Sequence, residues 1–76
     1  MSGTLDFTVV LEPQAEGGFT VSVPALPEVA TEGDSESEAL EMAADAIRLV
    51  LEYRRENGLP ISRDAVPTVR KITVAA

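Results

Sequence analysis

Residues 33–60 read GDSESEALEMAADAIRLVLEYRRENGLP, and this stretch decides the fold. Ser35 followed by Glu38 matches a capping box, in which the hydroxyl accepts from the N–H three residues on and the carboxylate reaches back. Asn57-Gly58 is typical of a helix C-terminus, and a proline follows soon after it. The sequence therefore predicts one long helix over residues 36–57.

Alternating apolar residues on either side of this helix predict four strands, over residues 5–12, 19–23, 29–32 and 68–75. Gly17-Gly18 closes the first two into a hairpin. The element order β-β-β-α-β predicts an α+β domain, in which a three-stranded antiparallel meander is joined by a fourth strand parallel to the first. With a right-handed crossover, the helix packs on one face and the sheet order is 3-2-1-4. The other face of the sheet is expected to be more polar, and to be solvated or to meet another subunit.

The predicted helix carries more apolar surface than one core contact requires. One stripe is expected to face the sheet: Leu40, Ala43, Ala44, Ile47, Val50 and Leu51. A second stripe lies beside it: Met42, Ala46, Leu49 and Tyr53. Either the loop over residues 59–67 covers this second stripe, or its side chains are simply exposed, or Met42, Leu49 and Tyr53 belong to an oligomer or partner interface.

The length and composition limit the number of domains and the kinds of functional site that the chain can contain. The 76 residues, 45% of them hydrophobic, form one domain (1–76), whose small core favours self-association as a homodimer or tetramer. The chain has no cysteine and no histidine, which removes disulfides, the usual zinc sites and Cys or His catalysis. Neither a signal peptide nor a membrane span is expected, so we predict a soluble, cytoplasmic protein. We assign no catalytic residue, cofactor or metal, and interpret the acids Glu38, Glu41 and Asp45 as a solvated helix face.

Charge is distributed unevenly along the chain. The net charge is −7, with −10 on residues 1–47 and +3 on residues 48–76. Acidic surface repels phosphate backbones, which disfavours direct nucleic-acid binding and favours a basic protein partner. The alternative is that the acids only keep a small domain soluble.

Three groups of residues follow one another at fixed spacings within residues 5–56: Gly17-Gly18-Phe19-x-Val21-x-Val23-Pro24-x-Leu26-Pro27, Thr31-x-Gly33-Asp34-Ser35-x-x-Glu38-Ala39, and Ala43-x-x-Ala46-Ile47. In this order they resemble the N-terminal domain of HicB-type antitoxins. The resemblance implies a partial ribonuclease-H-like fold without nuclease activity. It also implies a role as the antitoxin of a type II toxin–antitoxin pair, masking a small, basic, HicA-like toxin that cleaves mRNA.

Two departures from the family pattern limit what the resemblance implies. Glu28-Val29 stands where relatives often have Gly-Cys, which puts details of that loop in doubt. Many relatives continue into a DNA-binding domain, whereas this sequence stops at Ala76, so autorepression is not transferred.

The candidate partner-binding residues surround the bend after the second predicted strand: Pro24, Leu26, Pro27, Glu28 and Glu32. Their acids would cover a basic surface of the toxin. The alternative function is an orphan homo-oligomeric regulatory or structural domain with no cognate toxin. An enzyme is a distant third hypothesis, because no catalytic set converges in the sequence.

Overall fold

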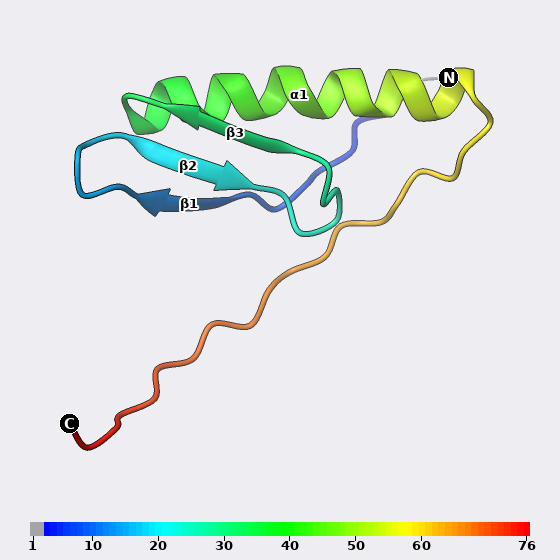
Figure 1. The fold of residues 1–76 in the computed structure, drawn as a ribbon. Coiled ribbons are helices and arrows are strands. Elements are labelled where there is room, and N and C mark those ends of the chain that lie inside the picture. Colours follow the sequence, from blue (N-terminus) through cyan, green and yellow to red (C-terminus); the bar gives the residue numbers. More distant parts are fainter. Residues whose placement is uncertain (1–2) are drawn as a thin grey trace.

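The computed structural model describes residues 3–76 and shows a three-stranded antiparallel sheet with one helix across one face (Figure 1). The strands are β1 (Val10–Pro13), β2 (Phe19–Ser22) and β3 (Ala30–Gly33), with β2 in the centre of the sheet. The helix α1 spans Glu36–Glu56. The predicted α+β class, the antiparallel meander and the helix are confirmed.

The β1–β2 hairpin is closed by glycine chemistry. Gly17 and Gly18 have φ of 101° and 81°, backbone conformations that L side chains rarely adopt. The Gly17 N–H donates to the Gln14 carbonyl at 3.0 Å, and the Gln14 N–H donates to the Gly18 carbonyl at 3.0 Å. These bonds set the register in which Pro13 pairs with Phe19 and Val10 with Ser22.

Both ends of α1 are capped as the sequence predicts. Ser35 is the N-cap, and its Oγ accepts from the Glu38 N–H at 3.1 Å. The Glu38 carboxylate accepts from the N–H of Asp34 at 3.0 Å, one residue earlier than in the standard capping box. At the other end, Asn57 is the C-cap and Gly58 has φ of 66°. The cap residues therefore limit α1 to within one residue of the predicted span.

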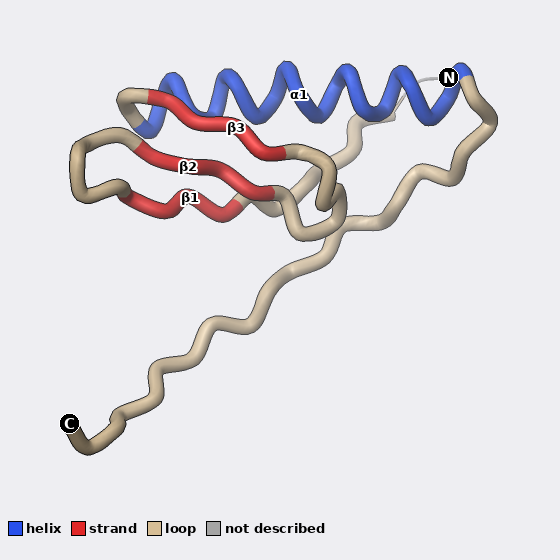
Figure 2. The backbone as a smooth tube through the Cα atoms, viewed as in Figure 1, coloured by secondary structure: helices blue, strands red, loops and turns tan. Residues whose placement is uncertain are grey.

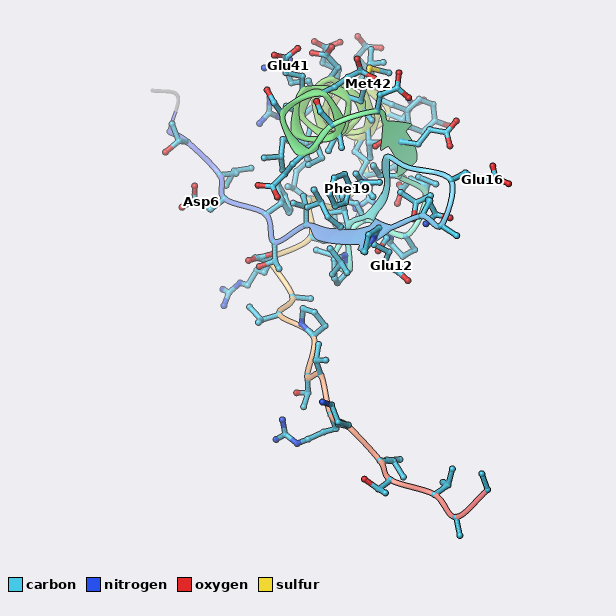
Figure 3. The ribbon with its side chains drawn as sticks, turned by 90° about the vertical axis from the view of Figure 1, so that its left-hand side faces the viewer. Asp6, Glu12, Glu16, Phe19, Glu41 and Met42 are labelled. Atoms are coloured by element: carbon cyan, nitrogen blue, oxygen red, sulfur yellow. The ribbon has the colours of Figure 1, made fainter. Side chains whose placement is uncertain are left out.

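The core lies between the sheet and α1 and consists of two clusters. One joins Val21 of β2 to Ala39 and Ala43 of α1, and the other joins residues of the β2–β3 connection: Val23, Leu26 and Val29. Phe7, Val9 and Leu11 pack against these clusters, as the alternation of the first predicted strand indicates. The strand itself begins only at Val10, and Leu5 is exposed. Viewed along α1, Phe19 lies between the sheet and the helix, whereas Glu41 and Met42 lie on the helix side that faces away from the sheet (Figure 3).

The helix contacts the sheet through small residues at its first turns. Ala39 and Ala43 are fully buried, but Leu40, which the sequence assigned to the core stripe, is 42% exposed. A Cβ on Gly33 would lie 2.4 Å from the Ala39 backbone nitrogen, so β3 and α1 approach backbone to backbone. Because Leu40 follows Ala39 by 100° around the helix, this contact turns Leu40 toward the rim of the core.

The predicted fourth strand is absent from this structure. Residues 59–76 form no helix or strand, and from residue 65 onward the chain leaves the domain as an extended segment (Figure 2). The radius of gyration is 14.9 Å, compared with about 11 Å for a compact domain of this length. The sheet order 3-2-1 is confirmed, whereas the parallel pairing of residues 68–75 with β1 is not formed. A strand needs a ladder partner, and this segment lies away from its own sheet.

No helix within residues 3–76 has the length and apolar character that crossing a bilayer requires.

Gly33→Ala should lower the free energy of unfolding by about 3 kcal/mol, because the new methyl group would overlap backbone atoms that cannot rotate away. Gly3→Ala is the control, since nothing lies within 4 Å of a Cβ there. Urea denaturation measures both variants. Equal stability of Gly33→Ala and wild type would show that β3 and α1 separate more easily than the structure indicates.

Ser35→Ala should lower the free energy of unfolding by about 1 kcal/mol, because the Glu38 N–H loses its acceptor. Ser37→Ala, two residues further along and also exposed, is the matched control. If both variants unfold at the same urea concentration, water or Asp34 replaces the Ser35 hydroxyl.

Candidate functional site

The bend between β2 and β3 is built from the inside by Leu26. Leu26 is fully buried, and two tight turns hold it: its N–H donates to the Val23 carbonyl at 2.9 Å, and its carbonyl accepts from the Val29 N–H at 2.9 Å. Leu26 therefore shapes the bend from the inside, and its contact with a partner stays a prediction. Pro24 is half-buried and Pro27 is exposed, so Pro27 is the proline of the bend that a partner meets most readily.

Glu28 forms an ion pair with Arg54 of α1. Arg54 Nη2 donates to Glu28 Oε2 at 2.6 Å, and Arg54 Nη1 donates to the Ser62 hydroxyl at 2.9 Å. The Arg54 hydrogen bond, aided by the backbone N–H of Glu28, holds the pKa of the Glu28 carboxyl below its usual value. The Arg54 side chain is only 16% exposed. Glu28 is thus already neutralised within the chain, and its charge is less available to a partner than the sequence indicated.

Arg54 was missed as a site residue because its position near the C-terminus of α1 suggested only a contact with the helix dipole. In the structure it also lines an open groove of about 310 Å³, together with Glu28, Tyr53, Leu59 and Pro60. This groove connects the acidic bend to the exposed stripe of α1, two surfaces that the sequence treated as alternatives. No sequence pattern indicates this pairing, because 26 residues separate Glu28 from Arg54.

Glu32 lies on another surface. β3 pairs Glu32 with Thr20 of β2, and Thr20 pairs with Glu12 of β1, so Glu12, Thr20 and Glu32 form one row across the sheet. The neighbouring Thr31 pairs with Val21, which packs against the helix, and alternation therefore places Glu32 on the open face. Gln14 Nε2 extends this polar row by donating to Thr20 Oγ1 at 3.1 Å. The structure does not join Glu28 and Glu32 into one acidic patch.

Three side chains of the second stripe are exposed on α1. Met42 is 47%, Leu49 66% and Tyr53 61% exposed, whereas Ala46 packs against the core. Tyr53 shares a groove with Leu59 and Pro60 of the following loop. The loop thus leaves Met42 and Leu49 uncovered. We call Met42, Leu49 and Tyr53 the outer stripe.

Charged side chains flank the outer stripe along one side of α1. Glu41 and Glu52 are exposed on α1, and Arg48 Nη1 contacts Asp45 Oδ1 at 2.5 Å in an exposed ion pair. An apolar centre within a charged rim is the usual anatomy of a protein interface. Within residues 3–76, no group of three or more His, Cys, Asp or Glu side chains is placed to hold a metal ion.

A larger groove, of about 430 Å³, lies between residues 3–7 and α1. Its lining is mainly apolar and contains Arg48 and Arg55 but no carboxylate. Such a lining offers no acid–base pair for a reaction.

Hydrogen bonds between Thr8 and Asp64 join the two ends of the domain; we call them the Asp64 tether. Thr8 donates from its N–H to Asp64 Oδ1 and from its hydroxyl to Asp64 Oδ2, both at 2.7 Å. The Thr8 N–H is the main cause that holds the pKa of Asp64 below its usual value, followed by the Thr8 hydroxyl. Residue 64 is therefore fixed beside the segment that leads into β1.

Comparison with known proteins finds relatives of two kinds. A UPF0150 protein of Thermoplasma acidophilum is 35% identical over 72 residues, which cover 95% of this chain and 100% of the relative. A UPF0150 protein of Archaeoglobus fulgidus is 35% identical over 51 residues, or 67% of this chain and 74% of the relative. The chain belongs to the UPF0150 family of HicB-like proteins.

The second kind of relative is longer than this HicB-like chain. Antitoxin HicB 1 of Photorhabdus laumondii is 49% identical over 51 residues, which are 67% of this chain and 33% of the antitoxin. Antitoxin HicB of Escherichia coli K12 is 37% identical over 51 residues, which are 67% of this chain and 37% of the antitoxin. The chain spans about a third of the length of these antitoxins. No family model matches the sequence.

The Glu28–Arg54 pair should make the stability of this HicB-like domain depend on pH. A lowered pKa in the folded state contributes stability above the usual value of 4.5, and that stability is lost as pH falls through the lowered pKa. Acidification from pH 6 should therefore destabilise wild type more than Glu28→Gln. Thermal unfolding at a series of pH values measures the difference.

Glu16→Gln is the matched control, because it removes the same charge from the β1–β2 turn. Its acid dependence should follow wild type. Parallel pH profiles for Glu28→Gln and wild type would contradict a stabilising role for the ion pair.

Proposed function

We propose that this chain is a non-enzymatic protein-binding module that acts as an antitoxin, and that it neutralises a small basic HicA-like toxin by covering the surface with which the toxin binds mRNA. The observation that carries the proposal is the 49% identity to a HicB antitoxin over 51 residues. That antitoxin is about three times as long as the matched region, so the proposal concerns toxin binding and not any further activity.

We infer that the partner binds the outer face of α1. The bend between β2 and β3 offers a partner less apolar surface and less free charge, because Leu26 is buried and Glu28 is paired with Arg54. The outer stripe offers a methionine and a tyrosine, both enriched at interfaces, beside charged side chains that are mostly acidic. The groove beside Tyr53 extends this face to Pro60 and Glu28.

In the proposed complex, charge would raise the association rate, and burial of apolar side chains would lower the dissociation rate. An acidic face attracts a basic partner and speeds association, but exposed charges are screened beyond about 10 Å at 0.1 M salt. Burial of the outer stripe does not depend on salt in this way. The proposed complex should therefore associate more slowly at high salt, with a smaller change in its dissociation rate.

Two charge-reversal pairs on opposite faces test the proposed surface against a HicA-like toxin. Glu41→Lys/Glu52→Lys changes the helix face, and Glu12→Lys/Glu32→Lys makes the same charge change on the open sheet face. The helix pair should slow association about tenfold more than the sheet pair, because its charges lie at the rim of the contact. Stopped-flow or surface-plasmon-resonance measurements at several salt concentrations give both rates.

A third variant, Leu49→Ala/Tyr53→Ala, should mainly accelerate dissociation, and Leu5→Ala is its control on another exposed apolar side chain. Equal effects of the two charge pairs would overturn the helix face as the binding surface. Absence of any toxin binding by the folded chain would overturn the antitoxin proposal and favour an orphan homo-oligomeric domain.

A further inference from the structure

The tail (residues 65–76) leaves its hydrophobic side chains in water. Val66, Val69, Ile72 and Val74 are 78%, 80%, 82% and 77% exposed. Figures 1 and 2 show the segment running away from the sheet and the helix. Single exposed apolar residues are common, but four in twelve residues, with none of them covered, indicate a surface that is buried in another state of the protein.

The amino-acid composition of the tail is typical of a β-strand. Residues 68–75 are TVRKITVA, rich in β-branched residues and free of glycine and proline. Ile72 and Val74 share one side of an extended chain with Arg70, and Thr73 and Ala75 share the other side with Lys71. This segment needs only a sheet edge to form a ladder.

The domain offers such an edge at β1. Within residues 3–76, β2 is the only strand that pairs with β1, so the opposite edge of β1 carries no strand. The side chains of Val9 and Leu11 already point toward the core beneath that edge. A strand added there would place two of its apolar side chains beside them, on the side of the sheet that α1 covers.

The bonds from Thr8 to Asp64 anchor the start of the tail at the entry to β1. Asp64 is held by both Thr8 donors, and Oδ1 also accepts from the Ala65 N–H at 2.9 Å. This places the start of the tail beside the entry to β1, yet the chain beyond Ala65 diverges from β1 (Figure 1). Twelve extended residues reach about 40 Å, far enough to cross to a neighbouring molecule.

The charge distribution also favours contact of the tail with a second copy of the chain. Residues 1–64 carry a net charge of −9, whereas the tail carries +2 from Arg70 and Lys71. Two acidic domains repel each other, and a basic tail laid on the partner's acidic domain offsets part of that repulsion. The acids near β1 include Asp6, Glu12 and Glu16 (Figure 3).

We propose that the tail pairs with the free edge of β1 in a second copy of this chain, so that two copies exchange their tails in a symmetric dimer. Each copy then has a four-stranded sheet, with the partner's tail where the sequence predicts the chain's own fourth strand. The exchange leaves the outer stripe of α1 uncovered, and it does not rest on the proposed antitoxin function.

Sedimentation of the full chain at high micromolar concentration tests the exchange. Wild type should be a dimer, and Ile72→Asp/Val74→Asp should be a monomer, with a dissociation constant raised at least about 100-fold. Thr73→Asp/Ala75→Asp adds the same charge on the other side of the segment and should stay a dimer. Amide NMR spectra check that residues 10–56 keep their fold in each variant.

A mixed sample of ¹⁵N-labelled and ¹³C-labelled chains shows which β1 the tail occupies. Nuclear Overhauser effects from the methyl groups of Ile72 or Val74 in the ¹³C-labelled chain to the amides of residues 10–12 in the ¹⁵N-labelled chain support the exchange. The same effects found only within one chain would overturn it in favour of an intramolecular fourth strand. A monomeric wild type, or a dimer that survives Ile72→Asp/Val74→Asp, would overturn it as well.

Discussion

The backbone contact between Gly33 and Ala39 is the constraint on which the rest of the domain depends. It forces β3 and α1 together where the chain passes from one to the other. Because the two backbones are this close, only small side chains fit between them, and Ala39 and Ala43 are buried against Val21. Larger residues further along α1, such as Ile47 and Val50, then meet the second cluster where the β2–β3 bend widens the space.

The same constraint determines which side of α1 remains free. Because α1 packs on the sheet through Ala39 and Ala43, the stripe beside them turns away from the core, and Met42, Leu49 and Tyr53 stay exposed. The ion pair between Arg54 and Glu28 then connects the far end of α1 to the bend, and the bond from Arg54 to Ser62 directs the chain beyond the helix. The outer stripe and the groove beside Tyr53 are thus two consequences of one packing geometry.

Local signals carried most of the prediction from sequence. The bounds of α1 follow from Ser35, Glu38 and Asn57, which act within one turn of the helix, and the meander follows from alternation and from the Gly17-Gly18 turn. The features that sequence reasoning missed all depend on distant partners. Leu26 resembles a surface residue of a proline-rich bend until Phe7, Ile47 and Val50 pack against its cluster. No spacing rule joins Glu28 to Arg54.

The predicted fourth strand shows most clearly the difference between local sequence signals and contacts with distant partners. Alternation identified residues 68–75 as strand-forming, and their composition still supports that, but alternation specifies a need for a partner and not the partner's identity. Topological rules favour the chain's own β1 because crossovers are usually intramolecular. The Asp64–Thr8 bonds bring the start of the segment to that edge, but the tail then diverges from it (Figure 1). If the edge is filled by a second copy, dimerisation and partner binding use different surfaces, because the free edge of β1 and the outer stripe lie on different elements. The two events would then be compatible in one complex, and mutations on one surface would leave the other intact.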